Sequence, residues 1–481
     1  MGILEIFLMC FALFLVVSAI LLIVLDNKNA EPGNAFAWLA IIMLFPILGA
    51  LLYFVFGFSW RRGKSANRNR QKFIDDLIPK LSLEVREFLK SHSSTEYLDM
   101  IDHDYKDVAK LLNNRSGVAV YHGSDIKTMT NGQEMFDSLL EDFRNAKHSI
   151  HLEYFQFRKD KNSRAIREVL MQKAQEGVKV RMIYDNIVNI DIFPSYYMKM
   201  KDSGVEVKPF TGPFLSSVRR SLNNRNHRKI SIIDGKIGYI GGMNLSGQTV
   251  HWKDLHLRIQ GKGIYGIQLA FLEMWHGSGG TLPDDIKSYF PLMNNKITHN
   301  LMQIVPDFPD AEYPFYLLSV VKAMQNAKKY VYIHTPYFVP TDYYKKALKS
   351  AVLSGVDVRV MVSHHTDFFI MDYTTQASYK EMLDAGVRIF EQQGYFNHGK
   401  YLVMDDYFSV VGTSNTNYRS FEVNFEINSF MYDKEMALRV KEIYEEDITK
   451  RCKEITLEEW NRRPLWKKIV QSIFRFISPL M

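Results

Sequence analysis

Two long apolar runs open the chain, and shorter apolar and polar stretches alternate after them. Residues 3–25 hold a single charged side chain, and residues 35–58 hold none. At 1.5 Å per residue, each run is long enough to cross a hydrocarbon core of about 30 Å as a helix. Pro46 and Gly49 would interrupt a soluble helix, but membrane helices tolerate them. The pattern predicts a transmembrane helical hairpin over residues 1–60.

A cleaved signal peptide is the alternative interpretation of the first run. Such a segment begins with a basic region and ends at small residues that mark the cleavage site. The first run lacks the basic region, and no cleavage site precedes the second run. Two retained helices are therefore favoured.

Basic residues beside the apolar runs predict their orientation. The connecting loop carries one lysine, whereas residues 61–72 carry six Lys/Arg and no acid. Cytoplasmic flanks of membrane helices are enriched in these residues. We therefore expect a cell membrane protein with two spans, whose body from residue 59 onward faces the cytoplasm.

The body beyond the runs repeats itself. Residues 61–119 are polar and helical in character, and we interpret them as a cytoplasmic linker region. After them, helical stretches alternate with β-rich runs, and NAKHSIHLEYFQF (145–157) returns as NAKKYVYIHTPYFVP (326–340). The alternation is typical of an α/β layer sandwich. Two unrelated α/β domains would not share the order of their landmarks, so the repeat predicts two pseudo-symmetric halves, residues 120–290 and 291–455.

The last segment, residues 460–481, has the pattern of an amphipathic helix. Its apolar face would comprise Trp466, Ile469, Val470, Ile473, Phe474 and Ile477, and its polar face Lys467, Lys468, Gln471, Ser472 and Arg475. A cationic face opposite an aromatic and aliphatic face is typical of a helix at a membrane surface. The alternative is a helix that docks on the core of its own domain.

The distribution of charge narrows the class of partner. The chain has 60 Lys+Arg and 53 Asp+Glu, a formal charge of +7. Eleven of the basic residues lie in residues 61–72 and 460–481, and the remaining body is slightly acidic. A nucleic-acid-binding domain would carry its basic residues on the folded body, so this distribution favours an anionic phospholipid membrane and argues against nucleic acid. Two cysteines are too few for a disulfide framework or a thiolate metal site.

Two copies of one polar motif carry the candidate chemistry. NHRKISIIDGKIGYIGGMN begins at residue 226, and NHGKYLVMDDYFSVVGTSN begins at residue 397. Both fit His-x-Lys-x4-Asp followed by Gly-x-x-Asn, with His227, Lys229, Asp234 and Asn244 in the first half and His398, Lys400, Asp405 and Asn415 in the second. Two matches at corresponding places in a duplicated chain are not a coincidence.

Strand geometry gives the motif its spacing. Side chains alternate along a strand, so His227 and Lys229 share one side, whereas Asp234 lies on the other. Asp234 also precedes Gly235, which is a hairpin turn signal. We therefore interpret Asp234 and Asp405 as mainly structural, despite their place in the motif. The returning strand would bring the asparagines back towards the His/Lys side.

The residue types suit phosphoryl transfer. Lysine ammonium groups and asparagine amides can donate to a phosphoryl oxygen that gains charge. One histidine can attack phosphorus while the other protonates the leaving alkoxide, and a second alcohol then reverses the roles. The product is an exchanged phosphodiester, formed through a phosphohistidine. Since the lysines supply the positive charge, we expect neither a metal nor another cofactor.

A histidine nucleophile needs an acceptor for its second ring nitrogen. Asp254 follows the first motif histidine by 27 residues, and Glu426 follows the second by 28. They are the matching acids of the two copies. A solvated charge is the alternative interpretation, but Glu426 lies between Phe425 and Ile427, which favours burial with a partner.

These paired motifs resemble those of the phospholipase D superfamily. The two apolar runs, the WKDLHLR segment, TPYFVPTD (335–342) and the C-terminal SPLM narrow the resemblance to the bacterial cardiolipin synthase family. It implies a duplicated phospholipase D-like α/β/α sandwich preceded by two transmembrane helices. It also implies transfer of a phosphatidyl group between two phosphatidylglycerols, which gives cardiolipin and glycerol. The catalytic positions would be His227, Lys229, Asp234, His398, Lys400 and Asp405, supported by Asn244, Asn415, Asp254 and Glu426.

The sequence departs from the superfamily pattern at several positions. A Gly-Ser pair common before the asparagine is Gly241-Gly242 in the first half, which removes a hydroxyl, whereas the second half keeps one at Thr413. An aspartate common after the second asparagine is Asn417, to which we assign no catalytic role. Glu153 resembles an acid near the family's active site, but its counterpart is His334, so the halves are not equivalent there.

Three rival functions share parts of this pattern. A phospholipase releasing phosphatidic acid would use the same motifs with water as acceptor. The membrane hairpin and the nearly neutral body argue against a nuclease, and the complete set of histidines, lysines and asparagines argues against an inactive membrane scaffold. The residues leave open which histidine attacks, and analogy favours His227.

Overall fold

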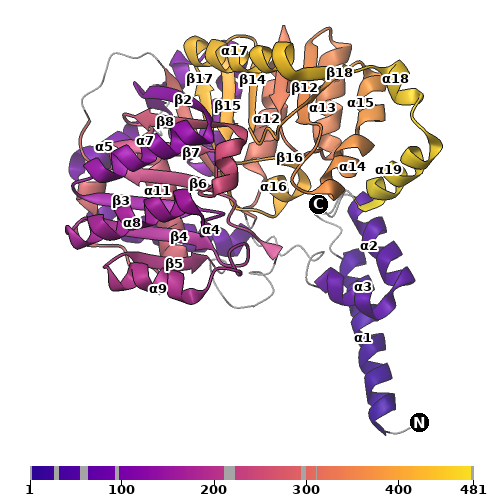
Figure 1. Ribbon diagram of the computed structural model, residues 1–481, viewed down its shortest axis with the longest axis horizontal. Helices are drawn as coiled ribbons and strands as arrows, with labels where there is room; N and C mark the ends of the chain where they lie inside the picture. The colour runs from indigo at the N-terminus through magenta and orange to yellow at the C-terminus, as the bar shows by residue number, and fades with distance from the viewer. Residues whose placement is uncertain are drawn as a thin grey trace.

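The computed structural model describes residues 3–25, 32–54, 63–92, 97–210, 223–293, 300–309 and 311–477. The loop between the two predicted spans, the end of the second span with the first basic residues, and residues 478–481 lie outside these residues, as do short parts of the predicted linker region and of both predicted halves. The body consists of two halves side by side, and the N-terminal helices extend from one end of it (Figure 1).

Two large sheets form the body, and their strands follow the same spatial order. The first sheet contains β2 (Asp125–Asn131), β8 (Lys253–Gln260), β7 (Ile237–Gly241), β6 (Lys229–Ile233), β3 (Ser149–Tyr154), β4 (Lys179–Asp185) and β5 (Glu206–Phe210). The second contains β1 (Tyr121–His122), β9 (Leu301–Asp307), β17 (Glu426–Tyr432), β15 (Phe408–Gly412), β14 (Tyr401–Met404), β10 (Tyr330–His334), β12 (Asp357–Ser363), β13 (Arg388–Gln392) and β18 (Cys452–Ile455). Apart from β1 and β18 at the edges, every strand of the second sheet has a counterpart in the first. The predicted α/β fold with two duplicated halves is confirmed.

The direction of the strands determines where the connecting loops gather. β3, β4 and β5 are parallel, as are β10, β12 and β13, whereas β6, β7 and β8 form an antiparallel meander next to β3. Parallel strands end together, so the loops that follow them gather at one edge, which is where α/β sheets bind ligands. A separate small sheet, β11 (Phe338–Val339) with β16 (Thr416–Asn417), lies in the second half.

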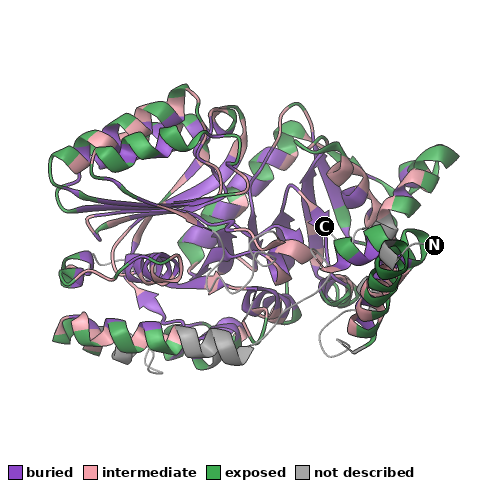
Figure 2. Cartoon of the chain, turned by 90° about the horizontal axis from the view of Figure 1, so that it is seen from below, coloured by how far each residue is buried: buried purple, intermediate pink, exposed green. Residues whose placement is uncertain are grey.

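Helices cover both sheets and bury one face each. The first half has α7 (Gly132–Asn145), α8 (Lys161–Gln175), α9 (Pro194–Asp202) and α11 (Ile264–Gly277). The second has α12 (Phe315–Asn326), α13 (Asp342–Leu353), α14 (Phe369–Ala377), α15 (Tyr379–Ala385), α16 (Tyr418–Glu422), α17 (Lys434–Arg451), α18 (Leu457–Asn461) and α19 (Leu465–Ile477). Side-chain caps define several starts; Asn131, for example, accepts from the Glu134 amide at the start of α7. The strands are mostly buried and the covering helices expose their outer faces (Figure 2).

One apolar core crosses the boundary between the halves. It joins Ile232 and Leu257 of the first sheet to Val411 and Met431 of the second. Continuous burial of this kind stabilises the halves as one unit. Groups from the two halves can therefore be held at fixed positions relative to one another.

The interpretation of residues 61–119 as a linker region is wrong. They contain α4 (Gly63–Leu77), α5 (Leu83–His92) and α6 (His103–Ser116). Phe73 and Leu77 pack into the core shared by both halves, and Val108 into the core of the second half. The apolar positions on these helices are few, so their polar composition hid a face that the body buries.

The N-terminal apolar runs differ in their helical structure. α1 (Ile3–Leu25) contains a 20-residue stretch, Glu5–Val24, long and apolar enough to cross a membrane. The second run is divided into α2 (Pro32–Leu44) and α3 (Pro46–Leu52), and among the described residues no second helix reaches that length. Pro46 lacks an amide proton and occupies the first turn of α3, while Phe45 leaves the helical conformation. Pro46 therefore causes the break between α2 and α3.

The C-terminal helix docks on the body and still exposes apolar side chains. Gln471, expected on the polar face, is buried, and its Nε2 donates to the side-chain Oε1 of Gln376 of α14 at 3.0 Å. Phe474 stacks on Tyr373 of the same helix. Leu465, Trp466, Ile469 and Ile473 stay exposed. One edge of α19 thus fits the docked alternative, while Trp466, Ile469 and Ile473 of the apolar face predicted for a membrane surface remain uncovered.

Candidate active site

Asp234 and Asp405 occupy tight turns at the far end of the motif strands. Both have positive φ, 53° and 55°. The Asp234 carboxylate accepts from the amides of Lys147, His148 and Ser149 at 2.7–2.9 Å, and Asp405 accepts from three matching amides ahead of β10. β3 and β6 run antiparallel with Ile150 opposite Ile233 and Tyr154 opposite Lys229, so Asp234 and Lys229 lie at opposite ends of β6. The catalytic assignment of the two aspartates is therefore corrected to the structural one.

The backbone of the opposite half holds each motif histidine. The His227 amide donates to the Phe425 carbonyl at 3.0 Å, and the His398 amide donates to the Lys253 carbonyl at 2.7 Å. Phe425 and Lys253 each precede a conspicuous acid in the sequence. The two contacts therefore carry those acids across the boundary between the halves.

The acids are exchanged between the two histidines. His227 Nδ1 lies 2.9 Å from Glu426 Oε2, and His398 Nδ1 lies 2.8 Å from Asp254 Oδ2. The sequence had placed each acid behind the histidine of its own half, and the structure pairs each with the other half's histidine. Asp254 is 2% exposed and Glu426 is fully buried, so the solvated-charge interpretation is wrong. Neither motif histidine takes its carboxylate partner from its own half.

Burial determines the protonation of the two histidine–carboxylate pairs before substrate binds. It lowers the pKa of His227 to about 4, with Glu426 opposing the shift, and lowers the pKa of His398 well below its usual range. It raises the pKa of Asp254 to about 6, opposed by Lys400. Near neutral pH both rings are then neutral, with the Nδ1 proton directed at a carboxylate. Each Nε2 is left with a free lone pair, as a nucleophile or a base requires.

The two motif lysines form a buried cationic site. Lys229 is fully buried and Lys400 is 3% exposed, and each ammonium group donates to the carbonyl oxygen of its own motif histidine. Burial lowers the pKa of Lys400 to about 8 and that of Lys229 well below its usual range. No carboxylate lies within ion-pair distance of either ammonium among the described residues. An anionic phosphodiester between them would supply the missing charge and raise both pKa values.

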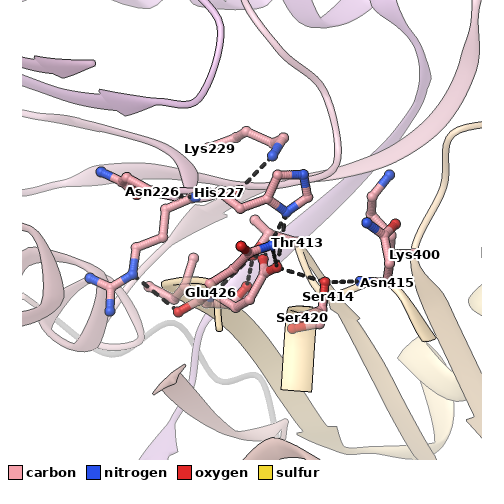
Figure 3. Close-up of polar contacts among 12 residues, drawn as sticks. Asn226, His227, Lys229, Lys400, Thr413, Ser414, Asn415, Ser420 and Glu426 are labelled. Atoms are coloured by element: carbon pink, nitrogen blue, oxygen red, sulfur yellow. Dashed lines mark hydrogen bonds and ion pairs between the residues drawn. The ribbon is translucent and has the colours of Figure 1, made fainter. Parts of the chain in front are cut away.

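Hydroxyl and amide groups complete the surroundings of Glu426 (Figure 3). Thr413 donates to its carboxylate at 2.6 Å and Ser420 at 2.8 Å. The Thr413 hydroxyl is therefore committed to holding the acid. In the first half Gly242 takes the place of Thr413, because a Cβ there would meet Asp254 Oδ1 at 2.2 Å. The missing hydroxyl thus makes room for the other acid.

The predicted asparagines follow the ends of the returning strands β7 and β15. Like the motif lysines, they are buried. Asn244 is 3% exposed, and its Oδ1 accepts from the Gln156 amide at 3.4 Å. Asn415 is 5% exposed, and its backbone amide donates to the Ser420 hydroxyl at 3.1 Å. Its Oδ1 is buried without a hydrogen-bond partner in the described part of the chain. The Asn417 side chain instead caps α16 by accepting from the Ser420 amide.

Arg228 is a buried residue that the sequence reasoning missed. Its Nε donates to the Glu426 carbonyl at 3.0 Å, and its guanidinium lies 3.9 Å from Glu153. In the second half the counterparts are Gly399 and His334, whose Nδ1 lies 2.8 Å from the Gly399 carbonyl oxygen. The sequence did contain a signal for this pair of residues. The first motif reads N-H-R-K where the second reads N-H-G-K, and the first half has Glu153 where the second has His334.

Aromatic rings line the two histidines and limit access of water. Phe155 lies edge-on to His227 with ring centroids 4.8 Å apart. Trp252 and Phe396 lie 5.3 and 5.5 Å from His398. The arrangement as a whole offers one ring nitrogen that can attack, a second that can take up and release a proton, and one buried lysine from each half beside them. It suits exchange of a phosphodiester through a covalent intermediate.

Comparison with known proteins agrees with this geometry. The chain matches the family model described as cardiolipin synthase, PLD-like domain, over residues 139–275 and 320–448, and the model described as phospholipase D-nuclease N-terminal over residues 11–57. Cardiolipin synthase 1 of Staphylococcus aureus (strain COL) is 33% identical over 97% of this chain and 95% of its own. A cardiolipin synthase of Listeria monocytogenes (serotype 4a, strain HCC23) is 33% identical over 100% of both chains. Among solved structures, phosphatidylserine synthase of Haemophilus influenzae Rd KW20 shares the fold, with a TM-score of 0.59 at 14% identity over 78% of this chain and 100% of that one.

Proposed function

The chain belongs to the cardiolipin synthase family of phospholipase D-like proteins, and from that premise we propose that it transfers a phosphatidyl group from one phosphatidylglycerol to another. The products are cardiolipin and glycerol. The observation that carries the proposal is the exchange of acids between the halves, which unites both histidines in one site. A single site with two histidines can form and resolve one covalent intermediate.

In the first step, Nε2 of His227 attacks phosphorus of the donor lipid. A phosphorus–nitrogen bond forms, the bond to the glycerol headgroup breaks, and His398 gives its Nε2 proton to the departing oxygen. Because both rings are neutral at rest, His398 must first gain that proton. The anionic phosphodiester between the rings favours this gain by raising the histidine pKa.

In the second step, the terminal hydroxyl of a second phosphatidylglycerol attacks phosphorus. Its proton passes to Nε2 of His398, the phosphorus–nitrogen bond breaks, and cardiolipin leaves. Lys229 and Lys400 stabilise the phosphoryl oxygens in both steps, and the asparagine amides add donors. One phosphodiester replaces another, so the reaction needs no nucleotide and runs backwards in excess glycerol.

The test is product analysis with the purified full-length protein in phosphatidylglycerol vesicles. We expect cardiolipin and free glycerol in equal amounts without added nucleotide. Phosphatidic acid as the main product would make the protein a hydrolase instead. An obligatory cytidine nucleotide donor would exclude the two-lipid exchange.

We also propose that the chain spans the cell membrane twice, with the body in the cytoplasm. α1 is long enough to span, and α2 with α3 would form the second span with a bend at Pro46. The basic residues after the second run favour a cytoplasmic body. A protease added outside intact cells should leave residues 59–481 uncut, and external cleavage there would overturn the orientation.

The exposed face of α19 is proposed to contact the same membrane. Trp466, Ile469 and Ile473 are 55%, 53% and 57% exposed, and Lys467 and Lys468 flank them. Such a surface binds anionic lipid through apolar insertion and charge. Replacing Trp466 and Ile469 by Ser should weaken contact with anionic vesicles, and unchanged contact in a folded variant would leave α19 with the docking role alone.

A further inference from the structure

Two loops at equivalent places in the halves expose large apolar side chains. The first apical loop, residues 186–193, links β4 to α9, and the second, residues 364–369, links β12 to the start of α14. Ile190 and Phe193 are 81% and 74% exposed in the first, and Phe368 and Phe369 are 57% and 68% exposed in the second. Isolated exposed apolar residues are ordinary, but matched pairs on both halves of a duplicated fold need a cause.

Both apical loops border the candidate active site. Asn189 of the first loop donates to the Phe155 carbonyl at 2.9 Å, and the Phe155 ring lies edge-on to His227. In the second loop, the Asp367 carboxylate accepts from the Tyr337 hydroxyl. The Tyr337 ring lies 6.3 Å from that of Phe396, which packs near the second motif histidine. The first loop is thus one ring removed from His227, and the second is two rings removed from His398.

Polar contacts hold the apical loops so that their apolar residues point outward. In the first loop, Asp185 accepts from the amides of Ile187 and Val188 at 3.1 Å, and Arg158 pairs with Asp191. In the second, Asp372 accepts from both the amide and the hydroxyl of Thr366. Because both loops are fixed in this way, the exposed side chains are presented by the fold.

We propose that the two apical loops are a paired membrane contact, each inserting its apolar residues into the phospholipid leaflet beside one histidine of the site. The inference rests on the proposed function, in which both substrates are membrane lipids. Each loop would hold one side of the site's opening against the bilayer, so that a lipid headgroup reaches the buried lysines without leaving the leaflet.

The position of the helices favours a bilayer as the occupant. α14 and α19 lie at the end of the second half from which α2 and α3 extend (Figure 1). α14 starts at Phe369, and α19 packs along it, so the exposed residues of α19 continue the surface of the second apical loop. An apolar surface that adjoins a membrane-spanning segment meets lipid before any soluble partner can cover it.

The experiment compares two forms of the same substrate with the full-length protein in phosphatidylcholine vesicles. Phosphatidylglycerol is supplied either within the bilayer or as a short-chain form dispersed below its micellar concentration. The variants are Ile190→Ser with Phe193→Ser, and Phe368→Ser with Phe369→Ser. We expect each to lose tenfold or more in kcat/KM on bilayer substrate and to stay within twofold of the unmodified protein on dispersed substrate.

The matched control is Leu353→Ser. Leu353 is 81% exposed, as Ile190 is, but it ends α13 and lies at the opposite end of β12 from the second apical loop. It should leave both activities unchanged. Equal loss on both substrate forms, or no loss on either, would overturn the membrane contact. Loss in cells without loss in vesicles would point to a protein partner and would also overturn it. An unmodified protein inactive on both forms would refute the proposed function itself.

Discussion

Replacing Glu426 by Gln should disable His227 although the two residues belong to different halves. The Glu426 carboxylate is fully buried and accepts from His227 Nδ1, Thr413 and Ser420 at 2.6–2.9 Å. Hydrogen bonds to a charged group contribute about 1.5–3 kcal/mol each, roughly twice the neutral value. At about 1.4 kcal/mol per tenfold, losing the charged half of the hydrogen bond to His227 lowers kcat by about 3–10-fold. An amide that stabilises the wrong ring tautomer deepens the loss towards about 10⁴-fold.

Two measurements separate this effect from general damage. Steady-state transfer is compared with that of Asp142→Asn, which removes a buried carboxylate that binds Arg258 and Tyr239. Unfolding in denaturant then gives a double-mutant cycle between Glu426→Gln and each histidine variant. Contacting groups couple by about 0.5–3 kcal/mol, whereas distant ones add within about 0.5 kcal/mol.

The exchanged pairing predicts which cycle shows coupling. Glu426 should couple to His227 and not to His398. Coupling of Glu426 to His398, which pairing within one half requires, would refute the geometry. A Glu426→Gln protein that folds and keeps its activity within twofold would refute the need for an acceptor at Nδ1.

Three further outcomes follow from contacts already described. His227→Ala and His398→Ala should each abolish transfer by several orders of magnitude, since acid–base assistance alone contributes about 10²–10⁴-fold; substantial residual turnover in either would contradict a shared site. Gly242→Ala should lower kcat at least tenfold in a folded protein, because its Cβ would meet Asp254 Oδ1 at 2.2 Å and displace that acid. Burial raises the pKa of Glu153 from 4.5 to about 7. Between these two pH values the carboxyl group ionises in the unfolded chain but stays protonated in the folded protein, so the folded protein loses stability as the pH rises. Glu153→Gln removes that loss, and its stability relative to the unmodified protein should grow by up to ~3 kcal/mol across this range in denaturant titrations; a constant difference would show that Glu153 does not titrate there.

The duplicated fold and the histidine–lysine strands were predictable because both rest on local patterns. A period of two places His227 and Lys229 on one side, and an Asp-Gly turn returns the strand towards Asn244. The repeat then implies that the second half does the same. These features depend on residues a few positions apart, which a sequence displays directly.

The exchange of acids was not predictable in this way. Asp254 lies 144 residues from its partner His398, and Glu426 lies 199 residues from His227. Which acid meets which histidine depends on how the two halves pack against each other. Because the halves are pseudo-symmetric, pairing within a half and pairing between halves fit the sequence repeat equally well. The packing of residues 61–119 was missed for the related reason that its apolar positions, Phe73 among them, complete a core built by distant strands.

The same long sequence separations determine when activity can first exist. During synthesis the chain emerges from its N-terminus, so the apolar helix α1 is complete long before Glu426 has been made. Until that residue arrives, His227 has no carboxylate partner and the two lysines have no second half around them. A nascent or truncated chain that lacks the second half is therefore inert. The enzyme can therefore become active only when the polypeptide has been completed through its second half.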